Sequence, residues 1–236
     1  MRILIFIIIL ERFNLSSTLI VLNLKTYLEG TGEGAVKVAQ ACKEVADDSG
    51  IEIGVAPQFC DIYRVASQVD LPVYAQSLDP VGAGSFTGHA FVQSIKDAGA
   101  VGTLINHSEC RLTLANIDAS ITTARNAALK TIVCTNNVAT SAAAAALGPD
   151  YVAVEPPELI GSGIPVSKAD PGVVTGSVDA VKRINPAVQV LCGAGISKGE
   201  DLAAALELGS VGVLLASGIV KAADPKAALE DLVSKV

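Results

Sequence analysis

Short apolar runs alternate along this chain with longer stretches in which apolar residues recur at helical spacing. The short runs are rich in β-branched residues and are predicted as strands: Thr18–Leu24, Ile51–Ala56, Pro72–Ala75, Gly102–Asn106, Thr131–Thr135, Tyr151–Glu155, Val188–Cys192 and Val211–Leu215. The longer stretches are predicted as helices: Gly34–Asp48, Asp61–Val69, Ala90–Ala98, Ile117–Leu129, Thr140–Leu147, Val173–Ile184, Lys198–Leu208 and Pro225–Lys235. Near-continuous apolar strands separated by helices indicate a parallel sheet that helices cover.

Eight strand–helix units are the number that closes a barrel, and about 220 residues suit a compact one. We therefore predict an α/β fold with a single (β/α)8 barrel over residues 17–236, and an open doubly wound sheet is the alternative. No linker or low-complexity segment divides this part of the chain. In such a barrel the carboxyl ends of all strands share one face, so polar residues at those ends converge there.

Residues 1–16 have a different character. Ile3–Leu10 is an apolar run that is far too short to cross a bilayer as a helix. Its length suits the apolar region of a signal peptide, but Glu11 and Arg12 interrupt it and no A-x-A cleavage site follows. We expect an extension outside the barrel, and we favour a mis-set start or a disordered tail over a signal peptide. No membrane partner is predicted.

Composition narrows the function further. Half of the residues are hydrophobic but only 4% are aromatic, so aliphatic side chains must fill the core. The net charge of −7 argues against nucleic acid as the main partner. The chain has five cysteines and no CxxC spacing, which indicates a reducing, cytoplasmic compartment, and Cys134 and Cys192 are predicted as buried thiols. With only His89 and His107 present, a zinc site is not expected.

The end of the sixth predicted strand carries the most informative chemistry. An apolar run ends on Glu155, two prolines follow, and then comes the Gly161-Ser162-Gly163 segment. This order is typical of a general base at the mouth of a strand, followed by a loop that closes over a bound molecule. An ordinary strand with an edge glutamate and a turn is the alternative.

Two other strand ends carry charged or polar residues. Asn23 and Lys25 close the first strand, where a lysine can hold an anionic substrate or offset developing negative charge. A solvated lysine and a Schiff-base amine remain alternatives. His107 closes the fourth strand, and a following helix N-terminus would lower its pKa and keep it neutral. A packed or capping histidine is the alternative there. Glu109 is expected to pair with Lys25 across the mouth.

Two glycine-containing turns follow the seventh and eighth strands. They are Gly193-Ala194-Gly195-Ile196-Ser197 and Ala216-Ser217-Gly218. Glycine lets backbone N–H groups approach an anion closely, and these are the turns where barrels bind phosphate. Two tight turns before helices are the alternative.

From about Thr18 to its carboxyl end, the chain resembles the triosephosphate isomerase family in its short archaeal form. The segments that carry the resemblance are Asn23–Tyr27, Thr103–Glu109, Ile132–Asn137, Val154–Gly161, Cys192–Ser197 and Leu214–Gly218. They cover six of the eight strand ends in order. The resemblance implies a TIM barrel that interconverts dihydroxyacetone phosphate and D-glyceraldehyde 3-phosphate, in glycolysis and gluconeogenesis, with no cofactor and no metal. It also implies a small phosphorylated triose as substrate and a homotetramer, with a homodimer as the alternative.

The resemblance further implies a role for individual residues. Glu155 is expected to move the proton, His107 to polarise the carbonyl as a neutral electrophile, and Lys25 and Asn23 to hold the substrate and stabilise the enediolate. The implied catalytic set is Glu155, His107, Lys25, Asn23 and Glu109, and the implied substrate-binding set is Asn23, Leu24, Lys25, Ile160, Gly161, Gly193, Gly195, Ala216 and Ser217.

The sequence departs from the family in three places. Gly195 stands where longer family members have a phosphate-binding serine, Leu24 stands where aromatic residues are common, and residues 1–16 have no counterpart. Two other functions stay open: a phosphate-binding barrel such as an aldolase that forms a Schiff base through Lys25, and a barrel that binds a phosphate ligand without catalysis.

Overall fold

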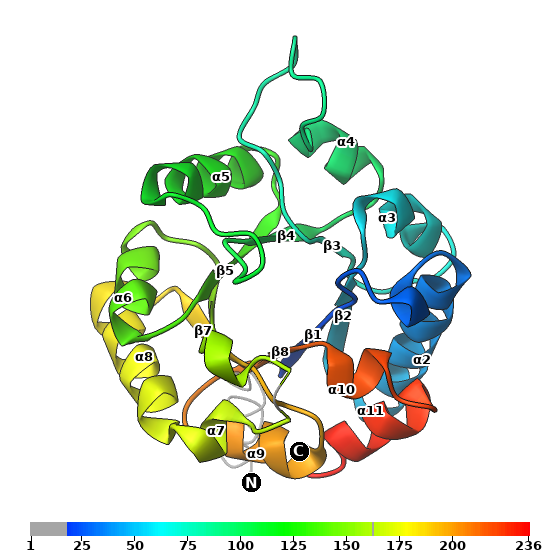
Figure 1. The fold of residues 1–236 in the computed structure, drawn as a ribbon, viewed down its shortest axis with the longest axis vertical. Helices are drawn as coiled ribbons and strands as arrows, with labels where there is room; N and C mark the ends of the chain where they lie inside the picture. Colours follow the sequence, from blue (N-terminus) through cyan, green and yellow to red (C-terminus); the bar gives the residue numbers. More distant parts are fainter. Residues whose placement is uncertain (1–17, 162) are drawn as a thin grey trace, which may run out of the picture.

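The structure, a computed structural model, describes residues 18–161 and 163–236. Eight parallel strands form one sheet in the order β2-β1-β8-β7-β6-β5-β4-β3. The sheet closes into a barrel, because Val55 of β2 forms a parallel bridge with Val73 and its N–H donates to the carbonyl oxygen of Pro72 at 3.0 Å. Helices surround the ring of strands (Figure 1). The predicted (β/α)8 barrel is confirmed, and the open sheet is excluded.

The observed strands differ from the predicted runs by no more than two residues at either end. They are β1 (Leu19–Asn23), β2 (Glu52–Ala56), β3 (Tyr74–Ala75), β4 (Gly102–Ile105), β5 (Lys130–Thr135), β6 (Tyr151–Val154), β7 (Gln189–Gly193) and β8 (Gly212–Leu215). The register pairs Leu19 with both Glu52 of β2 and Gly212 of β8, so the carboxyl ends of the strands come out on the same face.

The eight predicted helices are all present, with ends that shift by up to three residues. They are α2 (Glu33–Ser49), α3 (Phe59–Ala66), α4 (Val92–Asp97), α5 (Leu114–Asn126), α6 (Val138–Ala146), α8 (Pro171–Ile184), α9 (Gly199–Glu207) and α11 (Pro225–Val233). Four short elements were not predicted: the 3-10 helices η1 (Leu28–Gly30) and η2 (Pro157–Leu159), and the helices α7 (Val166–Ala169) and α10 (Ser217–Val220). All four lie in loops that follow strands, where too few residues are present to show helical spacing.

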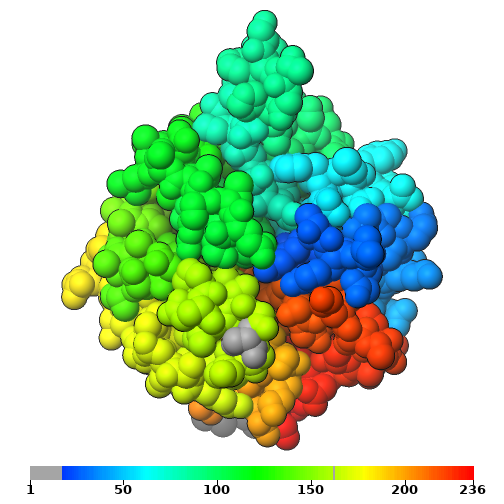
Figure 2. Space-filling view, in the orientation of Figure 1, coloured from blue at the N-terminus to red at the C-terminus, as the bar shows by residue number. Residues whose placement is uncertain are grey.

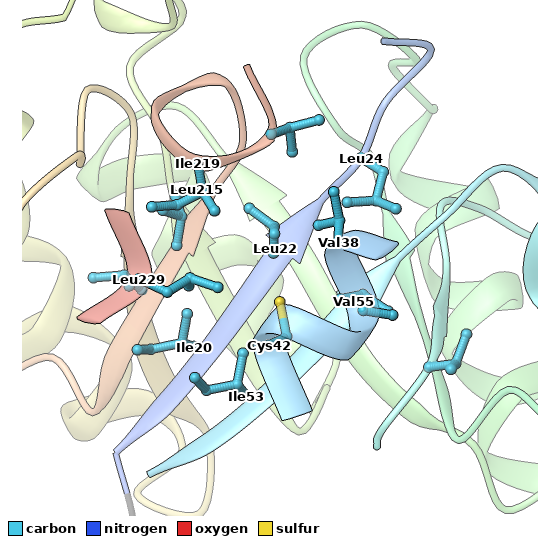
Figure 3. Packing of buried hydrophobic residues seen from close by; sticks show 14 of the residues in the cluster. Ile20, Leu22, Leu24, Val38, Cys42, Ile53, Val55, Leu215, Ile219 and Leu229 are labelled. Atoms are coloured by element: carbon cyan, nitrogen blue, oxygen red, sulfur yellow. The ribbon is translucent and has the colours of Figure 1, made fainter. Parts of the chain in front are cut away.

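Strand alternation divides the core into two layers. On β1, Leu19 and Val21 pack inside the barrel, whereas Ile20 and Leu22 pack outward against helices. Figure 3 shows this outer layer, in which Ile20, Leu22 and Leu24 lie against side chains of α2, β2, β8 and α11. The same alternation points Asn23 inward at the mouth, because side chains two residues apart share one face of a strand.

The mouth of the barrel lies on the face shown in Figures 1 and 2. The segments after β1 (blue), β4 (green), β6 (yellow-green) and β8 (orange) meet around the centre of this face. Residues 76–91, between β3 and α4, project from the barrel at the top of the view (Figure 1). Within the described residues, no helix is long and apolar enough to cross a membrane. The predicted extension, residues 1–16, lies outside the described part of the chain.

Candidate active site

The strand ends enclose a cavity of about 80 Å³ at the mouth of the barrel. Its lining comes from the ends of β1, β4, β6, β7 and β8 and from the segment after β6. The lining residues are Asn23, Lys25, Tyr27, His107, Glu155, Ile160, Gly161, Gly163, Ala194, Gly195, Ile196, Ser197, Leu214, Leu215, Ala216, Ser217 and Gly218. The three expected strand-end clusters therefore meet the two glycine-containing turns in one place.

Glu155 follows β6 directly, and its side chain is only 7% exposed. Its Oε2 has no hydrogen-bond partner among the described residues and lies 3.7 Å from Nε2 of His107. Burial raises the pKa of Glu155 to about 7, while the Cys134 thiol and the Lys25 ammonium oppose the increase. A carboxylate with a pKa near neutrality that points an unpaired oxygen into a cavity is suited to accept a proton.

Gly193 makes room for this carboxylate. A Cβ atom at Gly193 would lie 2.7 Å from Cδ of Glu155 and closer still to its Cγ, which real side chains do not tolerate. The backbone of Gly193 is part of β7 and does not have a positive φ. The glycine is therefore needed for space and not for its conformational freedom.

The structure assigns the tautomer of His107. The backbone N–H of Glu109 donates to Nδ1 at 3.3 Å, so the proton of the neutral ring lies on Nε2, which faces Glu155. Burial and the positive charge of Lys25 lower the pKa of His107 to about 4, and Glu109 opposes the decrease. The predicted neutral state agrees with this direction, but the predicted cause is wrong, because α5 begins only at Leu114. The pKa of His107 is low because the ring is buried beside Lys25, and not because a helix begins there.

Lys25 is held in position from both its backbone and its side chain. Its φ is +48°, its N–H donates to Oδ1 of Asn23 at 3.0 Å, and its carbonyl accepts from Nε2 of Gln76 at 3.0 Å. Its Nζ lies 2.7 Å from Oε1 of Glu109, which confirms the expected pair across the mouth. The Lys25 side chain is largely buried while Glu109 is half exposed, so the ammonium group is fixed beside the cavity.

The turns after β7 and β8 present backbone N–H groups to the cavity. The N–H groups of Gly195, Ser217 and Gly218 donate no hydrogen bond to another described residue. Gly195 has a φ of +74°, and a Cβ atom there would overlap the carbonyl of Ile164 and lie 2.7 Å from Cα of Pro165. Glycine is required at this position, and the free N–H groups can bind an anion.

A buried aspartate joins the turn after β7 to the far end of the segment that follows β6. Asp201 of α9 is 1% exposed; its Oδ2 accepts from the N–H of Ser197 at 3.2 Å and its Oδ1 from Nζ of Lys168 at 3.0 Å. Lys168 belongs to α7, whose Val166 also donates its N–H to the carbonyl of Ala194 at 3.3 Å. Neither contact of α7 has a signal in the sequence, because Lys168 and Asp201, like Val166 and Ala194, are distant in sequence and adjacent only in the fold.

Most of the residues expected in the site line the cavity, but three do not. Leu24 packs into the outer core, Gly193 lies under Glu155, and Glu109 faces a neighbouring cavity that also contains Lys25 and His107. Some lining residues had not been named individually. Ala194, Ile196, Ser197 and Gly218 belong to the two predicted phosphate turns and Gly163 belongs to the predicted closing loop, whereas Tyr27, Leu214 and Leu215 were not expected at the site. All but Gly163 lie inside the segments that carried the family resemblance. Among the described residues, no group of three potential metal ligands is gathered.

Comparisons with known proteins agree with this geometry. The sequence model described as triosephosphate isomerase matches residues 18–236. A triosephosphate isomerase of Methanococcoides burtonii is 83% identical over 218 residues, which are 92% of this chain and 99% of the relative. The relative of the same name from Methanosarcina barkeri is 74% identical over 91% of this chain and 96% of its own length. The one from Methanothermobacter thermautotrophicus is 59% identical over 96% of this chain and all of its own length.

Proposed function

The chain belongs to the triosephosphate isomerase family, and from this premise we propose how its residues interconvert dihydroxyacetone phosphate and D-glyceraldehyde 3-phosphate. The reaction moves a proton between adjacent carbons next to a carbonyl. It therefore needs a base that takes and returns the proton, a donor that polarises the carbonyl, and positive charge near the enediolate.

Glu155 is the base in this proposal. Its carboxylate takes the pro-R proton from C1 of dihydroxyacetone phosphate, and the electron pair moves to the carbonyl oxygen to form the enediolate. The carboxylic acid then returns the proton at C2, and His107 gives its Nε2 proton to O2 and takes the hydroxyl proton from O1, so that C1 becomes the aldehyde. The observation that carries this assignment is the buried Glu155 carboxylate, whose pKa is raised to about 7 and whose Oε2 has no described partner. A base is most effective when its pKa lies near the operating pH.

His107 is the neutral donor. Its Nδ1 accepts from the backbone of Glu109, which leaves the proton of Nε2 directed toward the carbonyl oxygen of the substrate. Lys25 and Asn23 hold the substrate and stabilise the negative charge of the enediolate. Glu109 holds the Lys25 ammonium group at 2.7 Å. This ion pair also argues against an aldolase, because a lysine that attacks a carbonyl must be a free amine.

The phosphate group of the substrate binds at the opposite side of the cavity. The N–H groups of Gly195, Ser217 and Gly218 are available for it, next to Ala216. Ile160, Gly161 and Gly163 line the same cavity from the segment after β6, which we expect to close over the bound substrate. Closure excludes water from the enediolate and prevents loss of phosphate. Two residues act without lining the cavity. Gly193 leaves space for the Glu155 side chain, and Leu24 packs the end of β1 against the outer core.

Three further properties belong to the proposal. The barrel is the folding unit from residue 17 onward, and the family match begins at residue 18. The enzyme works in the cytoplasm, which the free thiols of Cys42, Cys134 and Cys192 favour. It assembles as a homotetramer, with a homodimer as the alternative. Exposed apolar side chains such as Leu28, Phe86 and Leu114 favour self-association, and sedimentation equilibrium measures the state.

Two matched variants test the assignment of the base. Glu155→Gln should lower kcat at least 10³-fold with the fold retained, because Gln cannot accept the proton and no other carboxylate lies at the end of β6. Glu109→Gln removes a carboxylate that lies near the same histidine and should lower kcat far less. A loss below tenfold in Glu155→Gln, together with a large loss in Glu109→Gln, would transfer the role to Glu109.

A further inference from the structure

Asn106 lies between the last residue of β4 and His107, and it has a left-handed backbone with a φ of +61°. Along β4, Leu104 packs inside the barrel and Ile105 packs outside it. A strand that continued this alternation would point residue 106 inward and residue 107 outward. The left-handed residue interrupts the alternation, and His107 instead faces the mouth with its Nε2 3.7 Å from Oε2 of Glu155.

The side chain of Asn106 connects this turn to two other parts of the site. Its Nδ2 donates to the carbonyl oxygen of Cys134 on β5 at 2.9 Å, and its Oδ1 accepts from the N–H of Leu112 at 2.9 Å. Since β4 pairs with β5 only as far as Ile105, the amide replaces the ladder bond that a longer strand would have made. The thiol of Cys134 in turn interacts with the Glu155 carboxylate. The Asn106 side chain thus links the loop that carries His107 to β5, whose Cys134 contacts Glu155.

Asparagine suits this position for two separate reasons. It adopts the left-handed conformation more readily than other residues with a Cβ atom, and glycine is the only residue that does so more easily. Glycine, however, has no amide to bind Cys134 and Leu112. Aspartate keeps the acceptor for the N–H of Leu112 but offers no donor to the carbonyl of Cys134.

We propose that Asn106 is a positioning residue for the isomerisation: it turns His107 into the mouth and fixes the donor relative to the base. The inference rests on the roles proposed above for His107 and Glu155. Asn106 does not line the cavity, and it acts through the backbone of His107 and through β5. Replacing Asn106 should therefore slow the proton transfer and leave phosphate binding at the turns after β7 and β8 unchanged.

The test compares kcat, the KM for dihydroxyacetone phosphate and the inhibition constant of inorganic phosphate in two variants of Asn106. Asn106→Gly keeps the backbone conformation and loses both bonds, and we expect kcat to fall by about 10–100-fold, since small misplacements of a catalytic group cost up to that much. The inhibition constant of phosphate should stay within twofold. Asn106→Ala should be worse than Asn106→Gly, although alanine is closer in size, because alanine resists the left-handed conformation.

Two further variants separate positioning from stability and from the proposed function. Asn137→Ala removes an exposed asparagine that caps α6 by accepting from the N–H of Thr140 at 2.9 Å. It should lower Tm by about 2–4 °C and leave kcat within twofold. His107→Gln should lower kcat strongly. If it does not, the proposed role of His107 fails; if it does but Asn106→Gly retains kcat within twofold, the inference on Asn106 alone fails.

Two more results would overturn the inference. One is a kcat loss in Asn106→Gly that Asn137→Ala reproduces at an equal loss of Tm, because the loss would then result from reduced stability and not from the position of His107. The other is an Asn106→Ala variant with a higher kcat than Asn106→Gly, which would indicate that volume matters and backbone conformation does not. If Asn106→Gly does not fold, Asn106→Asp decides in its place: a kcat at least tenfold lower supports the inference, and one within twofold contradicts it.

Discussion

Replacing Glu155 with glutamine should make the protein more stable relative to the wild type as the pH rises. Burial raises the pKa of this carboxyl group from its ordinary value of 4.5 to about 7 in the folded protein. Folding therefore favours the protonated form. The stability that this form provides is fully present below about pH 4.5, is lost as the pH rises toward 7, and is absent above that value. Glutamine does not titrate, so the variant does not lose stability from this position as the pH rises.

The size of the effect follows from the same two values. A pKa that rises from 4.5 to about 7 corresponds to about 3 kcal/mol of free energy of unfolding. For a chain of this length that is a Tm difference of roughly 10 °C. The buried amide of the variant has its own hydrogen-bonding cost, but that cost does not change with pH. The quantity to measure is therefore the change in the Tm difference between the two proteins, and not the difference itself.

The assay is thermal or urea unfolding of both proteins at pH 4.5 and pH 8 in the same buffer ions. Other titrating groups are common to both proteins and cancel in the comparison. Glu158→Gln removes an exposed carboxylate three residues away and controls for the change in net charge; its Tm difference from the wild type should be the same at both pH values. A Glu155→Gln difference that changes by less than about 1 kcal/mol would refute the desolvated carboxylate. A change of the opposite sign would mean that attraction to Lys25 outweighs burial.

Three other predictions concern neighbouring features of the molecule. Nitrogen NMR of His107 should show a neutral ring down to about pH 5, because burial and Lys25 lower its pKa to about 4; an ordinary titration near 6.5 would contradict the assignment. Gly193→Ala should lower kcat at least about 10²-fold, because the added methyl group would displace Glu155, and unchanged kinetics would show that the carboxylate lies elsewhere during catalysis. Residues 17–236 expressed after an added Met should equal the full chain in activity and Tm, with better solubility; an inactive or unfolded product would show that the barrel needs residues 1–16.

The sequence was sufficient to predict the barrel, because strand and helix periodicity are properties of consecutive residues. The shared face of the carboxyl strand ends also placed Asn23 and Glu155 at the mouth. The position of His107 does not follow from alternation, which would point it outward. It depends on the left-handed backbone of Asn106, whose side chain binds the carbonyl of Cys134, 28 positions after Asn106 in the sequence.

Two other features were beyond sequence reasoning for the same reason. The cause of the low His107 pKa is burial next to Lys25, and burial at that position is known only once the barrel has closed. Gly193 appeared to be part of a phosphate turn, whereas its missing side chain makes room for Glu155 on the neighbouring strand. Each of these features depends on residues that are distant in sequence and adjacent only in the fold.

The most direct test of the central claim, that Glu155 carries the proton, is hydrogen exchange of dihydroxyacetone phosphate in D₂O. The wild-type enzyme should exchange the pro-R hydrogen at C1 with solvent deuterium and leave the pro-S hydrogen in place, since one base acts from one face of the bound substrate. In Glu155→Gln the rate of this exchange should fall at least 10³-fold. Inorganic phosphate should still inhibit the residual exchange of the variant, with an inhibition constant similar to that of the wild type. Exchange in Glu155→Gln that stays within tenfold of the wild-type rate, or exchange at both C1 hydrogens in the wild type, would contradict the account.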